Sequence, residues 1–331
     1  MNIEIQQDIS LREFNTLGLD VAAKHFAIVR SEDDVRYALA VAQESAWPIT
    51  VLGGGSNLVL CHDVEGLVIL VAIPGILFDG NQVEAGAGES WHHLVLCSLE
   101  QGLSGIENLS LIPGSVGAAP IQNIGAYGVE LVSVFDSLVA VDRESRQTVV
   151  LTREDCEFGY RNSIFKRKAK DRFVITRVRL NLSAVFEPNL SYRELEEAVS
   201  GLTLTPTVVS EVVSRIRRSK LPDPDQIGNV GSFFKNPVVD GARFVHLKRE
   251  YRDIPFWETD HGVKLSAGWL IDQCGLKGYR VGDAAISADH ALVIINMGRA
   301  TGPDVVGLAE YVQDMVNSRF DLQLEIEPTI T

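Results

Sequence analysis

The sequence predicts an α/β or α+β fold that is divided into about two domains. Short apolar runs typical of strands alternate with amphipathic helical patterns, and 331 residues correspond to about two domains on the usual length scale. A helical pattern at 208–220 ends before Pro222 and Pro224, a double-proline stop that favours a domain boundary. We therefore expect one region at 1–220 and a second domain at 221–331.

Helical periodicity predicts helices at 31–46, 90–101, 208–220, 267–274 and from about 302 onward. Ser31 can cap the first of these helices, because Asp34 lies where a capping-box partner is expected. Pro303 lies in the first turn of the last helix, where proline is best tolerated. Local signals thus predict where two of the helices begin.

Apolar runs predict strands at 49–52, 58–60, 68–72, 132–142, 148–151, 172–182 and 291–296. A last strand is expected around Leu322, Leu324 and Ile326, because these apolar residues alternate with polar ones. The strands between residues 132 and 182 indicate a β-rich subdomain.

The charge balance is acidic and excludes some classes of partner. Lys and Arg number 30 and Asp and Glu 44, so the net charge of −14 argues against binding nucleic acid or an anionic membrane through overall charge. A locally basic pocket is compatible with this sum, because net charge does not say where charges lie. We find no secretory signal, and the apolar stretch at 66–78 is too short to span a bilayer. We expect a cytoplasmic protein with reduced cysteines: Cys61, Cys97, Cys156 and Cys274.

The first glycine-rich segment lies between two predicted strands and consists of Gly53, Gly54, Gly55, Ser56 and Asn57. Successive glycines permit positive φ and expose backbone N–H groups, so this loop can hold a phosphate oxygen. A tight structural turn is the alternative interpretation. The segment matches neither the GxGxxG dinucleotide fingerprint nor a P-loop.

A second segment rich in small residues covers 113–128 and contains Ser115, Gln122 and Asn123 among its glycines. Small residues let the backbone approach a large flat ligand closely. A packed loop with several turns is the alternative. Two such loops in one half of the chain favour a cofactor that carries a diphosphate.

Two cations are candidates for binding an anionic substrate. Arg161 follows Tyr160, and its guanidinium presents a fork suited to a carboxylate or enolate oxygen. Lys220 is the last residue of its predicted helix and is expected to meet an anion. The remaining cations of that helix are interpreted as surface charges: Arg215, Arg217 and Arg218.

Ser232 is the candidate proton donor, because a hydroxyl can relay a proton where something positions it. No GxSxG elbow marks it as a hydrolase nucleophile. Glu325 and Glu327 share the polar face of the predicted last strand, for which a solvated face is the alternative. No metal site is expected, since His92 and His93 are consecutive on a helix and face different directions.

Six motifs of this chain resemble the UDP-N-acetylenolpyruvoylglucosamine reductases, also called UDP-N-acetylmuramate dehydrogenases. They are NTLGLDVAA at 15–23, VLGGGSNLVL at 51–60, GLSGIENLSLIPGSVGAAPIQNIGAYGVEL at 102–131, YRNSIFK at 160–166, GSFFKNP at 231–237 and KLSAGWLIDQCGLKG at 264–278. The motifs are long, follow the family's order and span nearly the whole chain. YRNSIFK and the segment that contains Tyr192 are similar to the family's type I branch.

The resemblance implies both a fold and an activity. Members combine an FAD-binding fold of the vanillyl-alcohol-oxidase type, in two subdomains, with a C-terminal α+β substrate-binding domain. They use NADPH and FAD to reduce UDP-N-acetylglucosamine enolpyruvate to UDP-N-acetylmuramate, a precursor of cell-wall peptidoglycan. Residues 1–220 would then bind FAD, in two subdomains divided near residue 70, and residues 221–331 would bind the substrate. We leave open whether the last strand returns to the first subdomain. A monomer without nucleic-acid or membrane partners is expected.

The resemblance also implies residue roles. FAD contacts fall on both glycine-rich segments: Gly53, Gly54, Gly55, Ser56, Asn57, Pro113, Gly114, Ser115, Gly117, Ala118, Gln122, Asn123, Gly125, Ala126 and Tyr127. Arg161 would polarise the substrate carboxylate, and Ser232 would protonate the carbon next to it after hydride has reached the neighbouring carbon. For the glutamate that stabilises the enol-like intermediate we assign Glu327, with Glu325 as the alternative. Substrate contacts are implied for Tyr160, Tyr192, Lys220, Asn236 and His290.

Two positions depart from the family's pattern. Glu327 is followed by Pro328 where the family has a short apolar run, and His290 takes the place of a glutamine, so its protonation would make substrate binding pH-sensitive. Two other functions remain alternatives. A flavin oxidase of the same fold would not need a serine that protonates carbon, and an inactive nucleotide-sugar-binding module would need neither Arg161 nor Ser232.

Overall fold

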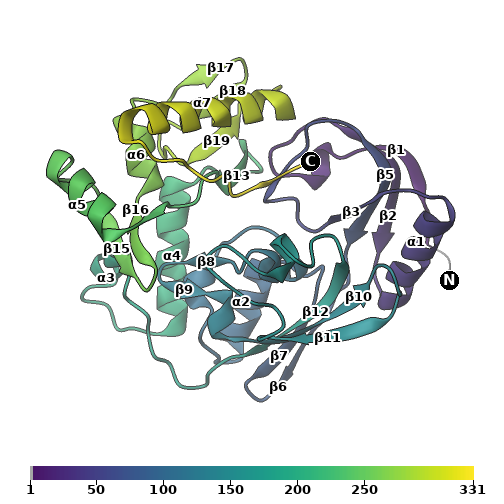
Figure 1. Ribbon diagram of the computed structural model, residues 1–331. Coiled ribbons are helices and arrows are strands. Elements are labelled where there is room, and N and C mark those ends of the chain that lie inside the picture. The colour runs from purple at the N-terminus through teal and green to yellow at the C-terminus, as the bar shows by residue number, and fades with distance from the viewer. Residues whose placement is uncertain (1–2) are drawn as a thin grey trace. The chain divides into compact units, whose positions relative to one another are not determined.

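The structure is a computed structural model that describes residues 3–331 (Figure 1). The chain forms two compact units, and the main division between them falls between Ser219 and Lys220. Unit 1 contains the described residues 3–9, Ala22–Gly55 and Asp63–Ser219, and unit 2 contains Ser10–Val21, Ser56–His62 and Lys220–Thr331. Two short N-terminal segments therefore belong to the same unit as the C-terminal third of the chain.

The first sheet of unit 1 has the strand order β1-β2-β5-β3. Its strands are β1 (Gln6–Ser10), β2 (Ala22–Val29), β3 (Ile49–Leu52) and β5 (Val64–Val71). β5 runs parallel to both β2 and β3, and helix α1 (Glu32–Glu44) packs against β2 and β5. The Ser31 hydroxyl accepts a hydrogen bond of 3.1 Å from the backbone N–H of Asp34, which confirms the predicted start of this helix.

The second sheet of unit 1 is antiparallel throughout, with the order β11-β10-β12-β7-β6. Its strands are β6 (Ile76–Asp79), β7 (Gln82–Gly86), β10 (Phe135–Asp142), β11 (Thr148–Thr152) and β12 (Phe173–Asn181). The strand predicted at 132–142 begins later than expected, because Leu131–Ser133 form a 3-10 helix, η4. Both sheets contribute to one large apolar core.

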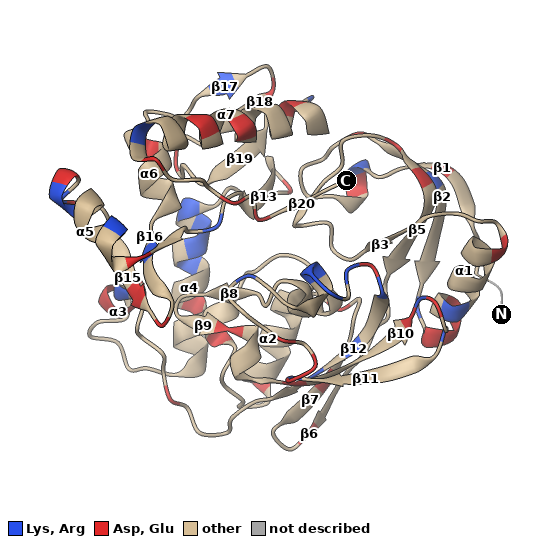
Figure 2. Cartoon of the chain, viewed as in Figure 1, with Lys and Arg blue, Asp and Glu red and all other residues tan. Residues whose placement is uncertain are grey.

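Three helices complete unit 1: α2 (Trp91–Glu100), α3 (Arg193–Ala198) and α4 (Pro206–Lys220). The intervening loops contain 3-10 turns η2 (Glu107–Leu109), η3 (Val116–Ile121) and η5 (Ile164–Lys166), and the short strands β8 (Gly125–Ala126) and β9 (Val129–Glu130). A buried hydrogen bond of 2.7 Å between the hydroxyls of Ser110 and Ser210 connects α4 to the segment after η2. Figure 2 shows that acidic residues are spread over many elements, whereas Lys and Arg gather on the C-terminal part of α4.

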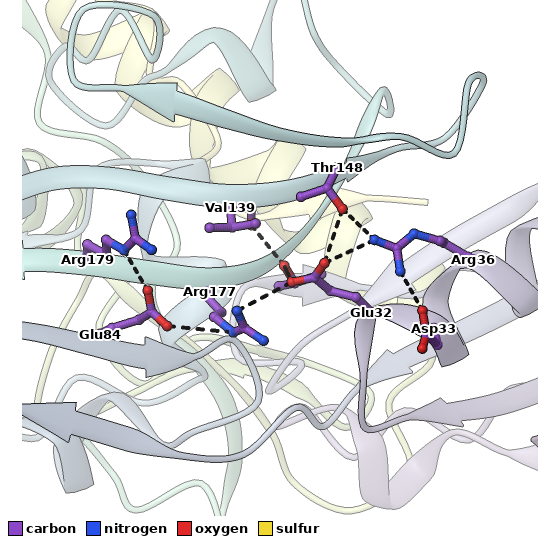
Figure 3. A network of polar contacts seen from close by, with 9 residues as sticks. Glu32, Asp33, Arg36, Glu84, Val139, Thr148, Arg177 and Arg179 are labelled. Atoms are coloured by element: carbon purple, nitrogen blue, oxygen red, sulfur yellow. Dashed lines mark hydrogen bonds and ion pairs between the residues drawn. The ribbon is translucent and has the colours of Figure 1, made fainter. Parts of the chain in front are cut away.

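A polar network connects α1 with the second sheet of unit 1 (Figure 3). Glu32 of α1 accepts a hydrogen bond of 3.1 Å from the Thr148 hydroxyl of β11 and pairs with Arg36 at 3.1 Å. The other oxygen of Glu32 lies 3.6 Å from Nη1 of Arg177 on β12, which also pairs with Glu84 of β7 at 3.8 Å. The network therefore fixes the helix of one sheet to the strands of the other.

The main sheet of unit 2 has the order β13-β19-β18-β17, and all of its pairs are antiparallel. The elements are β13 (Gly228–Ser232), β17 (Arg280–Val281), β18 (Ala284–Ile286), β19 (Val293–Asn296) and the helices α6 (Ala267–Gln273) and α7 (Gly302–Phe320). Thr301 and Asp304 form a reciprocal capping box at the start of α7, with Pro303 in its first turn. This start was predicted and is confirmed.

A second, smaller part of unit 2 was not predicted. It contains α5 (Gly241–Glu250) and a three-stranded sheet of order β14-β16-β15, with β14 (Val238–Val239), β15 (Phe256–Thr259) and β16 (Gly262–Leu265). The N-terminal segment of unit 2 contributes the 3-10 turn η1 (Arg12–Phe14).

The prediction of a continuous last strand was wrong. Residues 322–327 are extended but form only one isolated bridge, between Ile326 and Phe234. The strand that does form is β20 (Thr329–Ile330), which pairs in parallel with β4 (Leu58–Val59). Leu322 and Leu324 are buried, so the alternation reflects burial of one side rather than regular pairing. The strand pairs within unit 2, because β4 belongs to that unit.

Among residues 3–331, no helix is long and apolar enough to cross a membrane. All four cysteines are free thiols, and Cys156 is buried.

Candidate active site

The two glycine-rich segments lie against each other in unit 1. A Cβ atom on Gly54 would lie 2.6 Å from Cα of Gly114, and a Cβ atom on Gly53 would lie 2.6 Å from Oγ of Ser115. Real Cβ atoms do not approach backbone atoms this closely, so glycine is required at position 54, whereas a side chain at position 53 would have to displace the Ser115 hydroxyl. The structure thus brings together two loops that lie about sixty residues apart in the sequence.

Ser115 presents a hydroxyl that needs a partner. Its Oγ is buried and has no hydrogen-bond partner among the residues that the structure describes, 3–331. Ser115 pairs with Ser90 in an isolated bridge, and the backbone N–H of Trp91, the first residue of α2, donates to the Gly114 carbonyl at 3.0 Å. The unsatisfied hydroxyl therefore lies beside both glycine-rich segments, where a phosphate oxygen of a cofactor would accept its hydrogen bond.

Asn123 lies in the second glycine-rich segment, but its side chain is fully occupied. It is buried with φ of 48°, and Nδ2 donates to Oε2 of Glu130 at 2.9 Å and to the Gly159 carbonyl at 3.1 Å. Its Oδ1 accepts from the backbone N–H of Val132 at 3.0 Å. The amide thus braces the loop through both of its donor hydrogens and its oxygen.

Arg161 lies against the same segment. Its Nη2 donates to the Gly125 carbonyl at 2.6 Å, and a Cβ atom on Gly125 would lie 2.8 Å from its Nη1. The guanidinium carbon lies 5.4 Å from the centre of the Tyr160 ring. Arg161 has φ of 50°, an uncommon conformation for a residue with a side chain, and such strain is often found at functional sites. The structure therefore joins the predicted carboxylate-binding arginine to the predicted cofactor loop.

Tyr127 and Tyr192 meet edge to face in unit 1, with ring centres 5.2 Å apart. Burial raises the pKa of Tyr127 to about 12, and the nearby positive charge of Arg217 acts in the opposite direction. The Arg217 pKa is lowered, first by burial and also by the charge of Arg161. These residues therefore share one partly buried, cationic part of unit 1.

Arg217 is the residue that sequence reasoning missed. We interpreted it as a surface charge, but its side chain is partly buried and Nε donates to the Leu111 carbonyl at 3.2 Å. Arg215 and Arg218 are exposed, as expected. The sequence offered one signal: Arg217 follows the buried Ile216 and lies eight residues after the buried Val209, on the border of the apolar face of α4.

In unit 2, the backbone places Glu327 next to the residue that follows Ser232. The N–H of Glu327 donates to the Phe233 carbonyl at 2.9 Å, and Glu327 is buried. The alternative carboxylate, Glu325, has a side chain that is 70% exposed and forms an ion pair with Lys235. The two glutamates thus occupy different environments, one buried and one on the surface.

Two predicted substrate contacts lie at the N-terminus of α6. Oδ1 of Asn236 accepts from the backbone N–H of Ala267 at 2.9 Å. A Cβ atom on Gly268 would lie 3.8 Å from Cε1 of His290, and Nδ1 of His290 accepts from the N–H of Leu292 at 3.3 Å. This acceptor role puts the proton of a neutral His290 on Nε2.

The fold and these groups define a class of protein before any comparison. A buried hydroxyl beside two glycine-rich segments, an arginine held against one of these segments, and a separate unit with a serine and a buried carboxylate are the groups expected of an oxidoreductase that uses a nucleotide cofactor. In agreement, residues 23–147 match the family described as "FAD binding domain". Residues 223–331 match the family described as "UDP-N-acetylenolpyruvoylglucosamine reductase, C-terminal domain".

Individual relatives are similar over the whole chain. The UDP-N-acetylenolpyruvoylglucosamine reductase of Pseudomonas aeruginosa is 49% identical, with 100% of both chains covered. That of Pseudomonas savastanoi pv. phaseolicola is 47% identical, again with 100% of both chains covered. The crystal structure of UDP-N-acetylenolpyruvylglucosamine reductase from Thermus caldophilus is 29% identical, with a TM-score of 0.72 and 99% of both chains covered.

This chain belongs to the UDP-N-acetylenolpyruvoylglucosamine reductase family. It is a flavin-dependent oxidoreductase with FAD and NADPH as its cofactors. The family resemblance and the fold class that the sequence predicted are both confirmed.

Proposed function

We propose that this chain reduces UDP-N-acetylglucosamine enolpyruvate to UDP-N-acetylmuramate with electrons from NADPH, and that Arg161, Ser232 and Glu327 act on the substrate. Full-length similarity to reductases of that name supports the reaction. FAD, when bound, supplies the hydride chemistry that no amino-acid side chain provides. We assign FAD binding to residues 1–220 and substrate binding to 221–331.

The glycine-rich segments would hold the cofactor. The buried Ser115 hydroxyl, which has no partner among the described residues, supports this assignment, because a phosphate oxygen would accept its hydrogen bond. Gly53 and Gly54 keep the loop against Gly114 and Ser115, so no side chain fills the cradle. The other assigned contacts are Gly55, Ser56, Asn57, Pro113, Gly117, Ala118, Gln122, Asn123, Gly125, Ala126 and Tyr127.

Arg161 would bind the substrate carboxylate. The Gly125 carbonyl holds one nitrogen of the guanidinium, which fixes its plane and limits the entropy lost on binding. When hydride adds to one carbon of the enolpyruvyl double bond, negative charge develops on the other carbon and on the carboxylate. A fixed guanidinium stabilises that charge more than it stabilises the ground state, which is what lowers a barrier.

Ser232 would then donate its proton to the carbon next to the carboxylate, and Glu327 would stabilise the enol-like intermediate. The observation that supports this pairing is the backbone bond from Glu327 to Phe233, which keeps the buried carboxylate in register with the residue after Ser232. Glu325 is occupied by Lys235, which favours Glu327 as the functional residue. We assign substrate contacts to Tyr160, Tyr192, Lys220, Asn236 and His290.

The test separates the two half-reactions of the purified, FAD-loaded protein. In Ser232→Ala, we expect reduction of FAD by NADPH to stay within about twofold, while substrate-dependent reoxidation slows by about a hundredfold or more. The exposed Ser200→Ala is the matched control and should leave both rates unchanged. Equal slowing of both half-reactions would mean that Ser232 is structural.

We also infer that the chain acts as a monomer in the cytoplasm. Every group assigned above comes from one chain, so no second copy is needed to complete the site. Four free cysteines suit a reducing compartment. Sedimentation equilibrium of the FAD-loaded protein tests the first statement, and fractionation of cells that express the tagged chain tests the second.

A further inference from the structure

The residues that carry Glu327 form an extended strap, 322–331, in unit 2. Its beginning is fixed to two helices. Nη2 of Arg243 on α5 donates to the carbonyls of Phe320 and Asp321 at 2.6 and 3.0 Å. Nε2 of Gln313 on α7 donates to the Leu324 carbonyl at 2.7 Å. The strap therefore starts from a defined position.

The middle of the strap lies along the segment that follows Ser232. The N–H of Lys235 donates to the Glu325 carbonyl at 2.9 Å, and the N–H of Glu327 donates to the Phe233 carbonyl at 2.9 Å. These bonds fix the backbone N–H of Glu327. The position of its carboxylate, three bonds from Cα, also depends on the direction in which the strap continues.

The end of the strap pairs with the loop that follows the first glycine-rich segment. The N–H of Thr329 donates to the Asn57 carbonyl at 3.0 Å, and the N–H of Thr331 donates to the Val59 carbonyl at 3.0 Å. The N–H of Cys61 donates to the Thr331 carbonyl at 3.0 Å. Asn57, a predicted FAD contact, is thus held two residues away from Glu327 along the strap.

The other side of this loop is closed by α7. A Cβ atom on Gly302, the first residue of α7, would lie 2.1 Å from the Leu60 carbonyl oxygen. Since the loop cannot move toward α7, β20 has to move together with Asn57 when Asn57 is displaced. Pro328 separates Glu327 from Thr329, and its ring fixes its own φ angle. Rotation about this bond therefore cannot compensate for a movement of β20, and Glu327 moves as well.

We propose that Thr329 and Thr331 are positioning residues that couple occupancy of the FAD-binding loop to the placement of the Glu327 carboxylate. The inference rests on the proposed function, in which Asn57 contacts FAD and Glu327 acts on the substrate. FAD bound to the loop holds β4 in place, and β4 holds β20 through the hydrogen bonds from Thr329 and Thr331. The position of β20 in turn determines where the Glu327 carboxylate lies. Such coupling is reciprocal, so loss of the hydrogen bonds between the strap and β4 should also weaken FAD binding.

The first experiment removes one bond from the strap. Thr329→Pro abolishes the N–H that donates to Asn57, and Ile330→Pro is the matched control, because alternate N–H groups of a strand point away from its partner. We expect Thr329→Pro to weaken FAD binding to the apoprotein by about tenfold, the usual effect of one hydrogen bond. Substrate-dependent reoxidation should slow by about tenfold while reduction by NADPH stays within about twofold. Ile330→Pro should change each quantity less than threefold.

The second experiment asks whether the strap acts through Glu327. In a Glu327→Gln background, Thr329→Pro should still weaken FAD binding about tenfold but should slow reoxidation no further. A purely structural role for the strap predicts the same slowing in both backgrounds and would overturn the inference. Unchanged FAD affinity in Thr329→Pro would also overturn it.

A third measurement uses the wild-type chain, so it does not depend on whether the variants fold. Adding FAD to the apoprotein should slow hydrogen exchange of the amides at 329–331 by about tenfold or more, with no change at 241–250 of α5. Unchanged exchange at 329–331 contradicts the coupling. A wild-type chain that does not reduce the substrate contradicts the proposed function instead, and the FAD-affinity and exchange results still decide the coupling between loop and strap.

Discussion

At the scale of single residues, burial and neighbouring charges distinguish two glutamates that cannot be told apart from the sequence pattern. Glu325 and Glu327 have the same side chain and alternate along the same segment, so periodicity could not choose between them. The structure buries Glu327 and leaves Glu325 exposed beside Lys235. Since its exposed carboxylate is already paired with the largely buried Lys235, Glu325 is expected to support the structure rather than to act on the substrate.

The first prediction follows from that difference. Glu327→Gln should slow substrate-dependent reoxidation of the reduced enzyme by about a hundredfold or more, since an amide does not reproduce the way in which the carboxyl group would stabilise the enol-like intermediate. Glu325→Gln should stay within about threefold of wild type. Stopped-flow absorbance of the flavin measures both. The reverse order of effects would assign the role to Glu325.

Asn123 carries the second prediction. Its amide makes three hydrogen bonds inside the loop, so Asn123→Ala should lower the free energy of unfolding by about 2–4 kcal/mol, measured by urea denaturation. The exposed Asn317→Ala is the matched control and should change stability by less than about 0.5 kcal/mol. If Asn123→Ala keeps full stability but loses FAD, the amide contacts the cofactor directly rather than bracing the loop.

At the scale of elements, helix starts could be predicted and sheet partners could not. The caps at Ser31 and Thr301 are local, because each involves residues only three positions apart. Whether residues 322–327 form a strand depends on which segment lies beside them, and only Phe234 offers a bridge there. The α5 helix was missed for a related reason: only Leu247 in it is buried, so the sequence has no strong apolar period.

The turn between β10 and β11 shows how one carboxylate fixes an element. Oδ1 of Asp142 accepts from the N–H groups of Glu144 and Ser145 at 3.1 and 2.9 Å, and Oδ2 accepts from Nε of Arg172 at 2.8 Å. These bonds, above all the one from Ser145, lower the pKa of Asp142 from 3.8 to about 2. The folded state therefore favours the charged form of Asp142 more than the unfolded state does.

The third prediction is a pH dependence of stability. Because the folded pKa is the lower one, the stabilisation is complete above pH 4 and is lost as the pH falls toward 2, with a size of about 2 kcal/mol. Asp142→Asn should thus lower the free energy of unfolding by about 2 kcal/mol at pH 7 and by much less at pH 2. Urea titrations at both pH values measure this. An equal loss at both would show that the charge of Asp142 does not contribute.

At the scale of the whole molecule, the net charge of −14 was a poor guide to the ligands. The acidic residues are spread over many elements, while cations gather locally on α4 (Figure 2). Only the structure shows that Arg217 is partly buried near Arg161 and Tyr127, since these residues come from three distant parts of the chain. Motif resemblance found the glycine loops and Arg161, because their residue types are fixed by backbone geometry and ligand chemistry.

The assembly of unit 2 also could not be predicted. The sequence indicated a domain that begins after residue 220, but unit 2 includes Ser10–Val21 and Ser56–His62 as well. Thr16 exchanges two hydrogen bonds with Asn229, at 2.9 and 2.6 Å, and Nδ2 of Asn296 donates to the Leu17 carbonyl at 2.9 Å. No local pattern reveals such pairing, because its partners lie more than 200 residues apart.

The last prediction concerns a fragment of residues 220–331. It lacks the buried side chains of Leu11, Leu17 and Leu19, each of which contributes about 2 kcal/mol when buried, and it lacks β4 as the partner of β20. The loss is comparable to the whole stability of a small domain, so we expect the fragment to show no cooperative urea transition by near-ultraviolet circular dichroism. The full chain is the control and should unfold cooperatively. Cooperative unfolding of the fragment would mean that residues 220–331 fold independently, and that the N-terminal segments are not needed for the stability of this domain.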